Sequence, residues 1–222
     1  MFSPAAVEQL RAAAADYSLL LTKGYAEKSS LKLVGDRFAL TERQRLAVMR
    51  NSCSDQKLAL RKQKQLSLAD LTGQPLAIDG YNILITIEAA VSGGFVFKAR
   101  DGCIRDIAGI HGTYRKVTET VPAIELIGTF LKDHAAEDCL WLFDSPVSNS
   151  GRLKTLIGGL AEKNNWNWEV RLSLNPDAEL AKTDSAVASS DSTVLDKCQR
   201  WVNLAGVLIE SRIPDAHLID MV

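Results

Sequence analysis

Hydrophobic residues recur at helical spacing in the first third of the chain and gather into short apolar runs in the rest. Residues 3–25, SPAAVEQLRAAAADYSLLLTKGY, repeat apolar side chains every three or four positions, which predicts a helix capped by Ser3 and ended by Gly24. A second helix is predicted from Thr41 in LTERQRLAVMRNSC. The segment KSSLKLVGDRF between them is predicted to be short and turn-rich, and SDQKLALRKQKQLSLADLTG follows as a basic helix or linker.

From residue 75 onward the pattern changes to apolar runs separated by amphipathic segments. The runs PLAIDGYNILI, DCLWLFDSP, WNWEVRLSLNPD and SAVASSDS predict strands, with late strands in GVLIESRI and HLIDMV. ETVPAIELIGTFLKDH, SGRLKTLIGGLAEKNN and STVLDKCQRWVN predict helices, and FVFKARDGCIRDI predicts a small hairpin. Because the strands lack strict alternation and helices separate them, we expect a doubly wound, mainly parallel α/β sheet with helices on both faces.

Charge divides the chain into two parts. The composition is that of an ordinary globular protein, with 46% hydrophobic and 24% charged residues among 222. Residues 1–72 carry 12 Lys and Arg against 7 Asp and Glu, whereas residues 73–222 carry 14 against 20. We therefore expect a helical, basic N-terminal region (1–72) followed by an α/β domain (73–222). The basic part either faces a polyanion or packs against the acidic part.

Cysteine usage and hydropathy exclude several classes of protein. The four cysteines are far apart and form no CxxC pair, which argues against a zinc finger or a dense disulfide framework and fits a reducing cytoplasm. No apolar run approaches the roughly 18 residues of a membrane span, and Glu8 and Asp16 interrupt what would be a signal peptide. Motifs of the GxxxxGK[ST], HExxH and GxSxG types are absent. We expect a cytoplasmic protein without membrane contact.

Three apolar strands are followed by aspartates: Asp79, Asp144 and Asp191, with Asp177 after the third strand. Since the carboxyl ends of parallel strands meet at one crevice, these side chains are expected to converge. Two like charges at 4 Å repel by about 4 kcal/mol at an effective dielectric constant of 20, so such a cluster needs cations or raised pKa values. An all-oxygen cluster suits Mg²⁺ or Mn²⁺, which can support phosphodiester hydrolysis. The alternative is that Asp144 and Asp191 cap the helices that follow them.

The same segments carry a family resemblance. LAIDGYNIL resembles the opening strand of the NYN group of the PIN-like nuclease superfamily, LWLFDSP its second acidic strand, and AVASSDS its late strand. The whole chain also resembles a prokaryotic family of unknown function that joins a helical N-terminal region to such a domain. The resemblance implies a PIN-like fold and a metal-dependent nuclease that acts most often on RNA.

The resemblance also implies roles for single residues. Asp79 matches the first metal ligand, Asn82 its hydrogen-bonding neighbour, Asp144 the second acid and Asp191 the last. The third acid of that group usually lies on a helix before the late strand, where Asp177 is the candidate here and Asp184 the reserve. The interval from residue 177 to residue 191 is short for a full helix and a strand.

The insertion at residues 88–119 is rich in groups that could meet a nucleic acid. Its cations would suit a phosphate backbone, and Tyr114 or Tyr81 could stack on a base. His111 could hydrogen-bond a scissile phosphate or act as an acid or base, or be structural. The arginines could instead neutralise the aspartates in an ion-pair network. The expected substrate-binding residues are Lys98, Arg100, Arg105, His111, Arg115 and Lys116.

These patterns favour Mg²⁺- or Mn²⁺-dependent hydrolysis of phosphodiester bonds in RNA. Two other functions stay open: a catalytically silent module that binds nucleic acid or acts as a scaffold on the same fold, and a small-molecule phosphohydrolase. The sequence also leaves open whether the N-terminal region contacts substrate, a partner protein, or a second copy of the chain in a homodimer.

Overall fold

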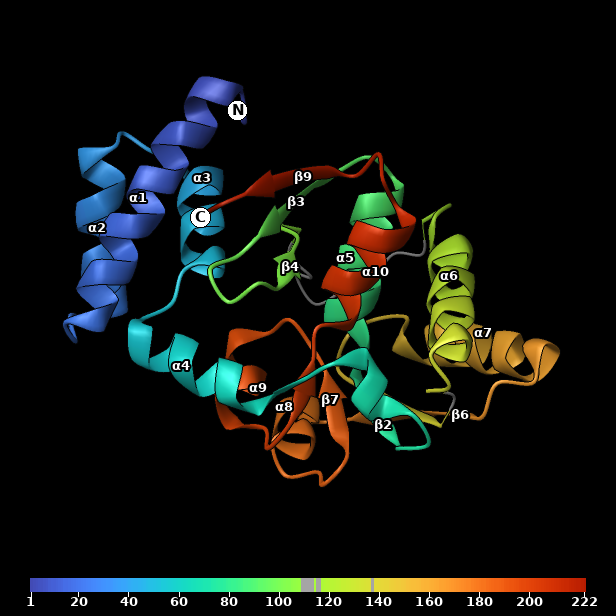
Figure 1. The fold of residues 1–222 in the computed structure, drawn as a ribbon. Coiled ribbons are helices and arrows are strands. Elements are labelled where there is room, and N and C mark those ends of the chain that lie inside the picture. The colour runs from blue at the N-terminus through green and yellow to red at the C-terminus, as the bar shows by residue number, and fades with distance from the viewer. Residues whose placement is uncertain (109–113, 115–116, 137) are drawn as a thin grey trace.

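A six-stranded sheet, parallel at every pairing, forms the centre of the computed structural model, which describes residues 1–108, 114, 117–136 and 138–222 (Figure 1). Its strands, in order across the sheet, are β1 (Gln65–Leu66), β8 (Trp201–Val202), β7 (Ala186–Ala188), β2 (Leu76–Asp79), β5 (Cys139–Asp144) and β6 (Trp168–Ser173). This confirms the predicted parallel α/β layout.

The strand order reverses at β2. The chain proceeds from β2 to β5 and β6 on one side, then crosses back to β7 and β8 on the other. In open α/β sheets ligands bind outside the carboxyl ends of the strands at such a switch point. The ends of β2, β5 and β7 are therefore where the topology places a site.

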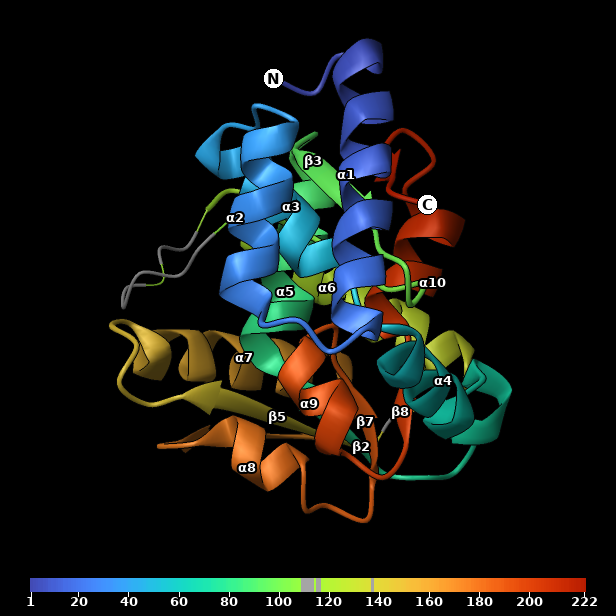
Figure 2. The ribbon, with the colours of Figure 1, turned by 90° about the vertical axis from the view of Figure 1, so that its left-hand side faces the viewer.

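Helices cover both faces of the sheet. Leu76 and Ile78 of β2 pack in a large core with one set of helices, while Ala77 between them packs in a smaller core with the other set. Figure 2 shows α7 and α8 on opposite sides of β5. The first set is α5 (Gly80–Val91), α6 (Thr120–Asp133), α7 (Ser150–Asn164) and α10 (Leu204–Arg212); the second is α8 (Pro176–Leu180) and α9 (Ser192–Lys197).

The N-terminal helices pack on a second, three-stranded sheet (Figure 1). Phe97 from the insertion and Ile219 from the C-terminal strand share one core with Leu10 and Val48. The chain's C-terminal strand thus lies on the helical region. These elements are α1 (Pro4–Thr22), α2 (Glu27–Arg37) and α3 (Glu42–Asn51), and strands β3 (Phe95–Lys98), β4 (Ile104–Arg105) and β9 (His217–Asp220). Helix α4 (Asp55–Lys64) packs against α9, and the short helix η1 (Leu68–Leu71) packs in the large core of the main sheet.

Several local predictions are confirmed. The side chain of Ser3 accepts a hydrogen bond from the amide of Ala6 at 3.4 Å, and Thr41 forms a capping box with Gln44. The hairpin of the insertion is present as β3 and β4. No helix in the described part of the chain is long and apolar enough to cross a membrane.

Four local predictions are wrong. STVLDKCQRWVN is helical only as far as Lys197, and Trp201 and Val202 form strand β8. KSSLKLVGDRF lies mostly in helix α2, which buries Ser30 and Val34 one turn apart. GVLIESRI is helix α10, because Asn203 caps the amide of Gly206 at 3.2 Å and the buried positions recur at helical spacing. The strand in WNWEVRLSLNPD stops at Ser173, and Pro176 then begins α8, so Asp177 lies on a helix.

Candidate active site

Asp79 ends β2 as a nearly buried carboxylate with 5% exposure. The neighbouring strand β7 brings Ser189 beside it, and the Ser189 hydroxyl donates to Oδ2 of Asp79 at 2.6 Å. Asn82, one turn into α5, donates from Nδ2 to both carboxylate oxygens at 3.1 and 3.0 Å. Gly80 lacks a side chain because a Cβ there would stand 2.4 Å from the ring of Phe143. The motif DGYN thus turns a buried strand into a helix while fixing the carboxylate.

Asp144 lies half-buried at the end of β5. Burial raises the pKa of its carboxyl above the ordinary value. Asn149 occupies the N-cap position of the next helix, α7, five residues further on. The alternative that Asp144 caps this helix is therefore wrong.

Asp191, by contrast, is a cap. Its Oδ1 accepts hydrogen bonds from the amides of Thr193 at 2.7 Å and Val194 at 3.2 Å. Its own amide donates to the hydroxyl of Ser189 at 2.9 Å. Ser189 therefore links the backbone of Asp191 to the carboxylate of Asp79, and one Asp191 oxygen is committed to helix α9.

Asp177 stands in the first turn of α8, with its side chain at the surface. The surrounding protein and the negative charges of Asp191 and Asp144 raise the pKa of its carboxyl. The reserve candidate, Asp184, accepts a hydrogen bond from Nε2 of Gln199 at 3.2 Å, and β7 begins two residues later. Asp177 is thus the better placed of the two.

The four carboxylates act on one another electrostatically. Burial, together with the charges of Asp191 and Asp177, raises the pKa of Asp79 to about 7, although hydrogen bonds from Ser189 and Asn82 oppose this. No arginine or lysine in the described part of the chain forms an ion pair with any of the four. Within the same part, no three His, Cys, Asp or Glu side chains are arranged so that they could hold a metal ion. The acids share one edge of the sheet without converging on a point.

The described cations of the insertion have other partners. Lys98 pairs with Glu210 at 2.7 Å, and Arg100 pairs with Asp55 at 2.5 Å. Arg105 is 3% exposed, so the expectation that it contacts substrate is corrected: it is a buried structural residue. His111, Arg115 and Lys116 lie outside the described residues.

The two tyrosines expected to stack on a base are also buried. Tyr81 and Tyr114 are each 4% exposed and pack against one another with ring centroids 5.5 Å apart. The Tyr114 hydroxyl donates to the buried carboxylate of Glu88, which also accepts from Thr120 at 2.5 Å. Both rings belong to the core around α5 and are not free for a base.

A buried ion-pair network, which the sequence patterns do not predict, supports the site. Both terminal nitrogens of Arg105 donate to Asp101, at 2.9 and 2.7 Å, and Arg61 of α4 donates to the same carboxylate at 2.5 Å. Burial alone would raise the pKa of Asp101, but the two guanidinium groups hold it well below its usual range. Nε of Arg105 also donates to the carbonyl of Ser190 at 2.6 Å. The network therefore fixes the loop that carries Asp191.

Replacing Arg105 by methionine tests this support. Because Arg105→Met removes one of the two guanidinium partners of the buried Asp101 and leaves the Ser190 carbonyl without its donor, we expect it to lose about 3–5 kcal/mol of unfolding free energy in a urea titration. Arg171→Met is the matched control, since it breaks the exposed pair with Glu169 and is expected to cost at most about 1 kcal/mol. Equal losses in the two variants would contradict the supporting role.

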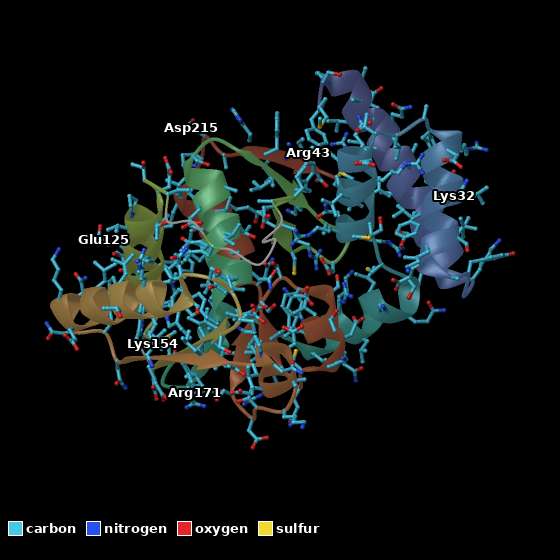
Figure 3. All side chains as sticks on the ribbon, turned by 180° about the vertical axis from the view of Figure 1, so that it is seen from behind. Lys32, Arg43, Glu125, Lys154, Arg171 and Asp215 are labelled. Atoms are coloured by element: carbon cyan, nitrogen blue, oxygen red, sulfur yellow. The ribbon has the colours of Figure 1, made fainter. Side chains whose placement is uncertain are left out.

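Asp79 should make stability depend on pH in the absence of divalent ions. Its pKa is raised from an ordinary value of 3.8 to about 7, so the folded chain holds a proton that the unfolded chain releases. Stability therefore falls as pH rises through this window. The side chain that Asp79→Asn introduces carries no charge at any of these pH values. In urea titrations with EDTA, the unfolding free energy of Asp79→Asn should therefore rise relative to that of the wild type by about 1.4 kcal/mol for each pH unit between 3.8 and about 7. The exposed Asp215 (labelled in Figure 3) gives the control Asp215→Asn, which should run parallel to wild type. If the unfolding free energy of Asp79→Asn depends on pH as that of the wild type does, the raised pKa of Asp79 is refuted.

Comparisons with known proteins place the chain in a family. The model of the domain family DUF5616, described as a domain of unknown function, matches residues 68–207. A second model, DUF434, described as a protein of unknown function, matches residues 9–64. An uncharacterized protein of Methanocaldococcus jannaschii is 32% identical over 180 residues, which cover 81% of this chain and 86% of that protein. No solved structure matches the chain. The chain therefore belongs to the DUF5616 family, with a DUF434 region at its N-terminal side.

Proposed function

We propose that this protein is a PIN-like, metal-dependent nuclease that hydrolyses phosphodiester bonds in RNA. The observation that carries the proposal is Asp79: a buried carboxylate at the switch point of a parallel sheet, with a pKa raised first by burial and then by neighbouring acids, and with no cationic partner described. Strongly perturbed carboxylates in such a position are typical of functional sites. The described parallel sheet agrees with a PIN-like layout, and the motif resemblance supplies the reaction class.

The donor set fits a hard divalent ion. Carboxylate oxygens are the ligands that Mg²⁺ and Mn²⁺ prefer. A bound cation would also offset the electrostatic repulsion among these acids. Asp79, Asp144 and Asp191 would hold the ion, with Asp177 as the fourth acid. A bound ion of this kind supplies Lewis-acid activation of water and stabilises the leaving oxygen. Because no three of these side chains are arranged for an ion as they stand, the proposal requires them to approach one another.

The chain's own residues prepare the site for such chemistry. Asn82 donates to both oxygens of Asp79 and so restricts rotation of the carboxylate. Ser189 links the end of β2 to the loop that carries Asp191 by bonding both. Neither residue neutralises the negative charge. The acids therefore stay attractive to a cation that would draw them together.

A catalytically silent nucleic-acid-binding module is the second candidate. Two observations favour it: the carboxylates do not converge, and one oxygen of Asp191 is engaged in capping α9. Fold alone does not decide between the two functions.

Metal binding can be tested without activity. A ligand that binds the folded state raises the melting temperature, so Mn²⁺ added to EDTA-stripped protein should raise Tm of the wild type. Asp79→Asn and Asp144→Asn should lose most of this shift, whereas Asp215→Asn should retain it. A shift that is the same in all four proteins, or absent from all, would exclude a site at these acids.

Catalysis is tested with single-stranded RNA and Mn²⁺. We expect cleavage by the wild type and a loss of about 10²-fold or more in Asp79→Asn and Asp144→Asn, the scale for removing a group that stabilises transition-state charge. Binding without cleavage by any of the proteins would favour the silent module. Cleavage of an aryl phosphate but not of RNA would favour a small-molecule phosphohydrolase.

A further inference from the structure

A pocket of about 250 Å³ lies between the helical region and the α/β part of the chain. Helices α1 to α4 supply one wall, and the loop after β7 with the start of α9 supplies the other. Figures 1 and 2 both show α4 beside α9, which pack against one another. The pocket is therefore built jointly by the segments that match two different family models.

The pocket adjoins the candidate active site through Asp191. This residue lines the pocket, and its charge also raises the pKa values of Asp79 and Asp177. A polymer held at these carboxylates would therefore have an adjacent unit at the mouth of the pocket.

Two cations of the helical region line the pocket and are only loosely held. Arg50 lies 3.9 Å from the carboxylate of Asp106, which itself accepts shorter hydrogen bonds from Thr86 at 2.8 Å and the amide of Ala108 at 2.7 Å. Arg50 also donates to the carbonyl of Ala108, at 3.3 Å. An anion in the pocket could therefore replace these contacts of Arg50 at little cost.

Lys57 is the second cation, and 45% of its side chain is exposed. It lies 3.1 Å from Asp196, which already accepts from Arg61 at 2.8 Å, and 3.7 Å from Glu27. Glu27 lines the same pocket and is an exposed negative charge that would oppose an anion. Arg61 and Arg105 also line the pocket but are buried and paired with Asp101 and Asp196, so among the described lining residues Arg50 and Lys57 are the cations available to a ligand.

Part of the helical wall is apolar. Met49 is 42% exposed and lines the pocket together with Leu21 and the largely buried ring of Tyr17. A flat, unstacked base can lie on such a surface, while a phosphate meets the cations beside it. At about 250 Å³ the pocket is below the usual range of about 300–1,000 Å³ for ligand pockets, which suits one nucleotide and excludes a duplex.

We propose that this pocket binds one nucleotide of a single-stranded RNA, with its phosphate on Arg50 and Lys57 and its base against Met49. The inference rests on the proposed function, because it places one nucleotide of the same RNA substrate in a pocket beside the candidate active site. It gives the helical region a direct part in recognising substrate.

Binding is measured by fluorescence anisotropy on the full chain, with fluorescein-labelled oligouridine in EDTA so that cleavage does not interfere. Arg50→Ala and Lys57→Gln should each weaken binding several-fold and lower the slope of log K against log salt by about 0.7 for each phosphate contact removed. Glu27→Gln should tighten binding, since it removes an opposing charge. Arg43→Ala on α3 (labelled in Figure 3) and Lys62→Gln on α4 carry the same charge changes outside the pocket lining and should bind like wild type.

The outcomes separate this inference from the proposed function. Loss confined to Arg50→Ala and Lys57→Gln supports it, even if the protein cuts no RNA. Equal effects in pocket and control variants overturn it, even if Asp79→Asn abolishes cleavage. Binding of an acidic peptide that depends on Arg50, with no binding of oligouridine, also overturns it and makes the pocket a protein-docking site.

A second measurement does not depend on how the variants fold. Single-stranded RNA containing 4-thiouridine is cross-linked to the wild-type protein by ultraviolet light, and the modified peptides are identified by mass spectrometry. We expect cross-links in the peptide that contains Met49. Cross-links found only in peptides that do not line the pocket would overturn the inference.

Discussion

The arrangement of this molecule depends on the ion pairs that Asp101 forms with two arginines. The Asp101 carboxylate is buried, and it accepts from Arg61 of the helical region and from Arg105 of the insertion. Taking these charges out of water costs several kcal/mol per ion, which is offset only where geometry and hydrogen bonding are good. Here the pairing is bidentate on Arg105, and that guanidinium also holds the carbonyl of Ser190. The helical region is thereby tied to the loop that carries Asp191.

Two buried aspartates in this chain have opposite environments. Asp101 is surrounded by guanidinium groups that keep its pKa well below the usual range, whereas the pKa of Asp79 is raised to about 7 by burial and by other acids. The first is fully compensated and therefore structural. The second is left with hydrogen bonds but no described cation, a condition that costs stability and that folded proteins usually retain at sites of function.

Sequence patterns predicted the parts of the fold that local chemistry determines. Apolar runs located β2 and β5, and cap residues such as Thr41 marked helix starts, because these signals lie within a few residues of their effects. The same reasoning failed for Arg105, since its partners depend on long-range packing: Arg61 and Asp101 are 40 positions apart, and Arg105 and Ser190 are 85 apart. A strand-end pattern also predicted that Asp79 and Asp191 lie at one edge, and it left open whether Asp191 caps the next helix, which the structure shows that it does with one oxygen.

The division of the chain into two family matches does not make it two independent units. The C-terminal strand β9 pairs with β3, and Ile219 shares a core with Leu10 of the first helix. Strand β1, which follows α4, completes the edge of the main sheet by pairing with β8. Each part therefore buries surface that the other supplies, so an isolated α/β segment would expose apolar side chains and lose Arg61, one of the two partners of Asp101. The proposed chemistry involves the whole chain, because helices α1 to α4 form one wall of the pocket that Asp191 lines.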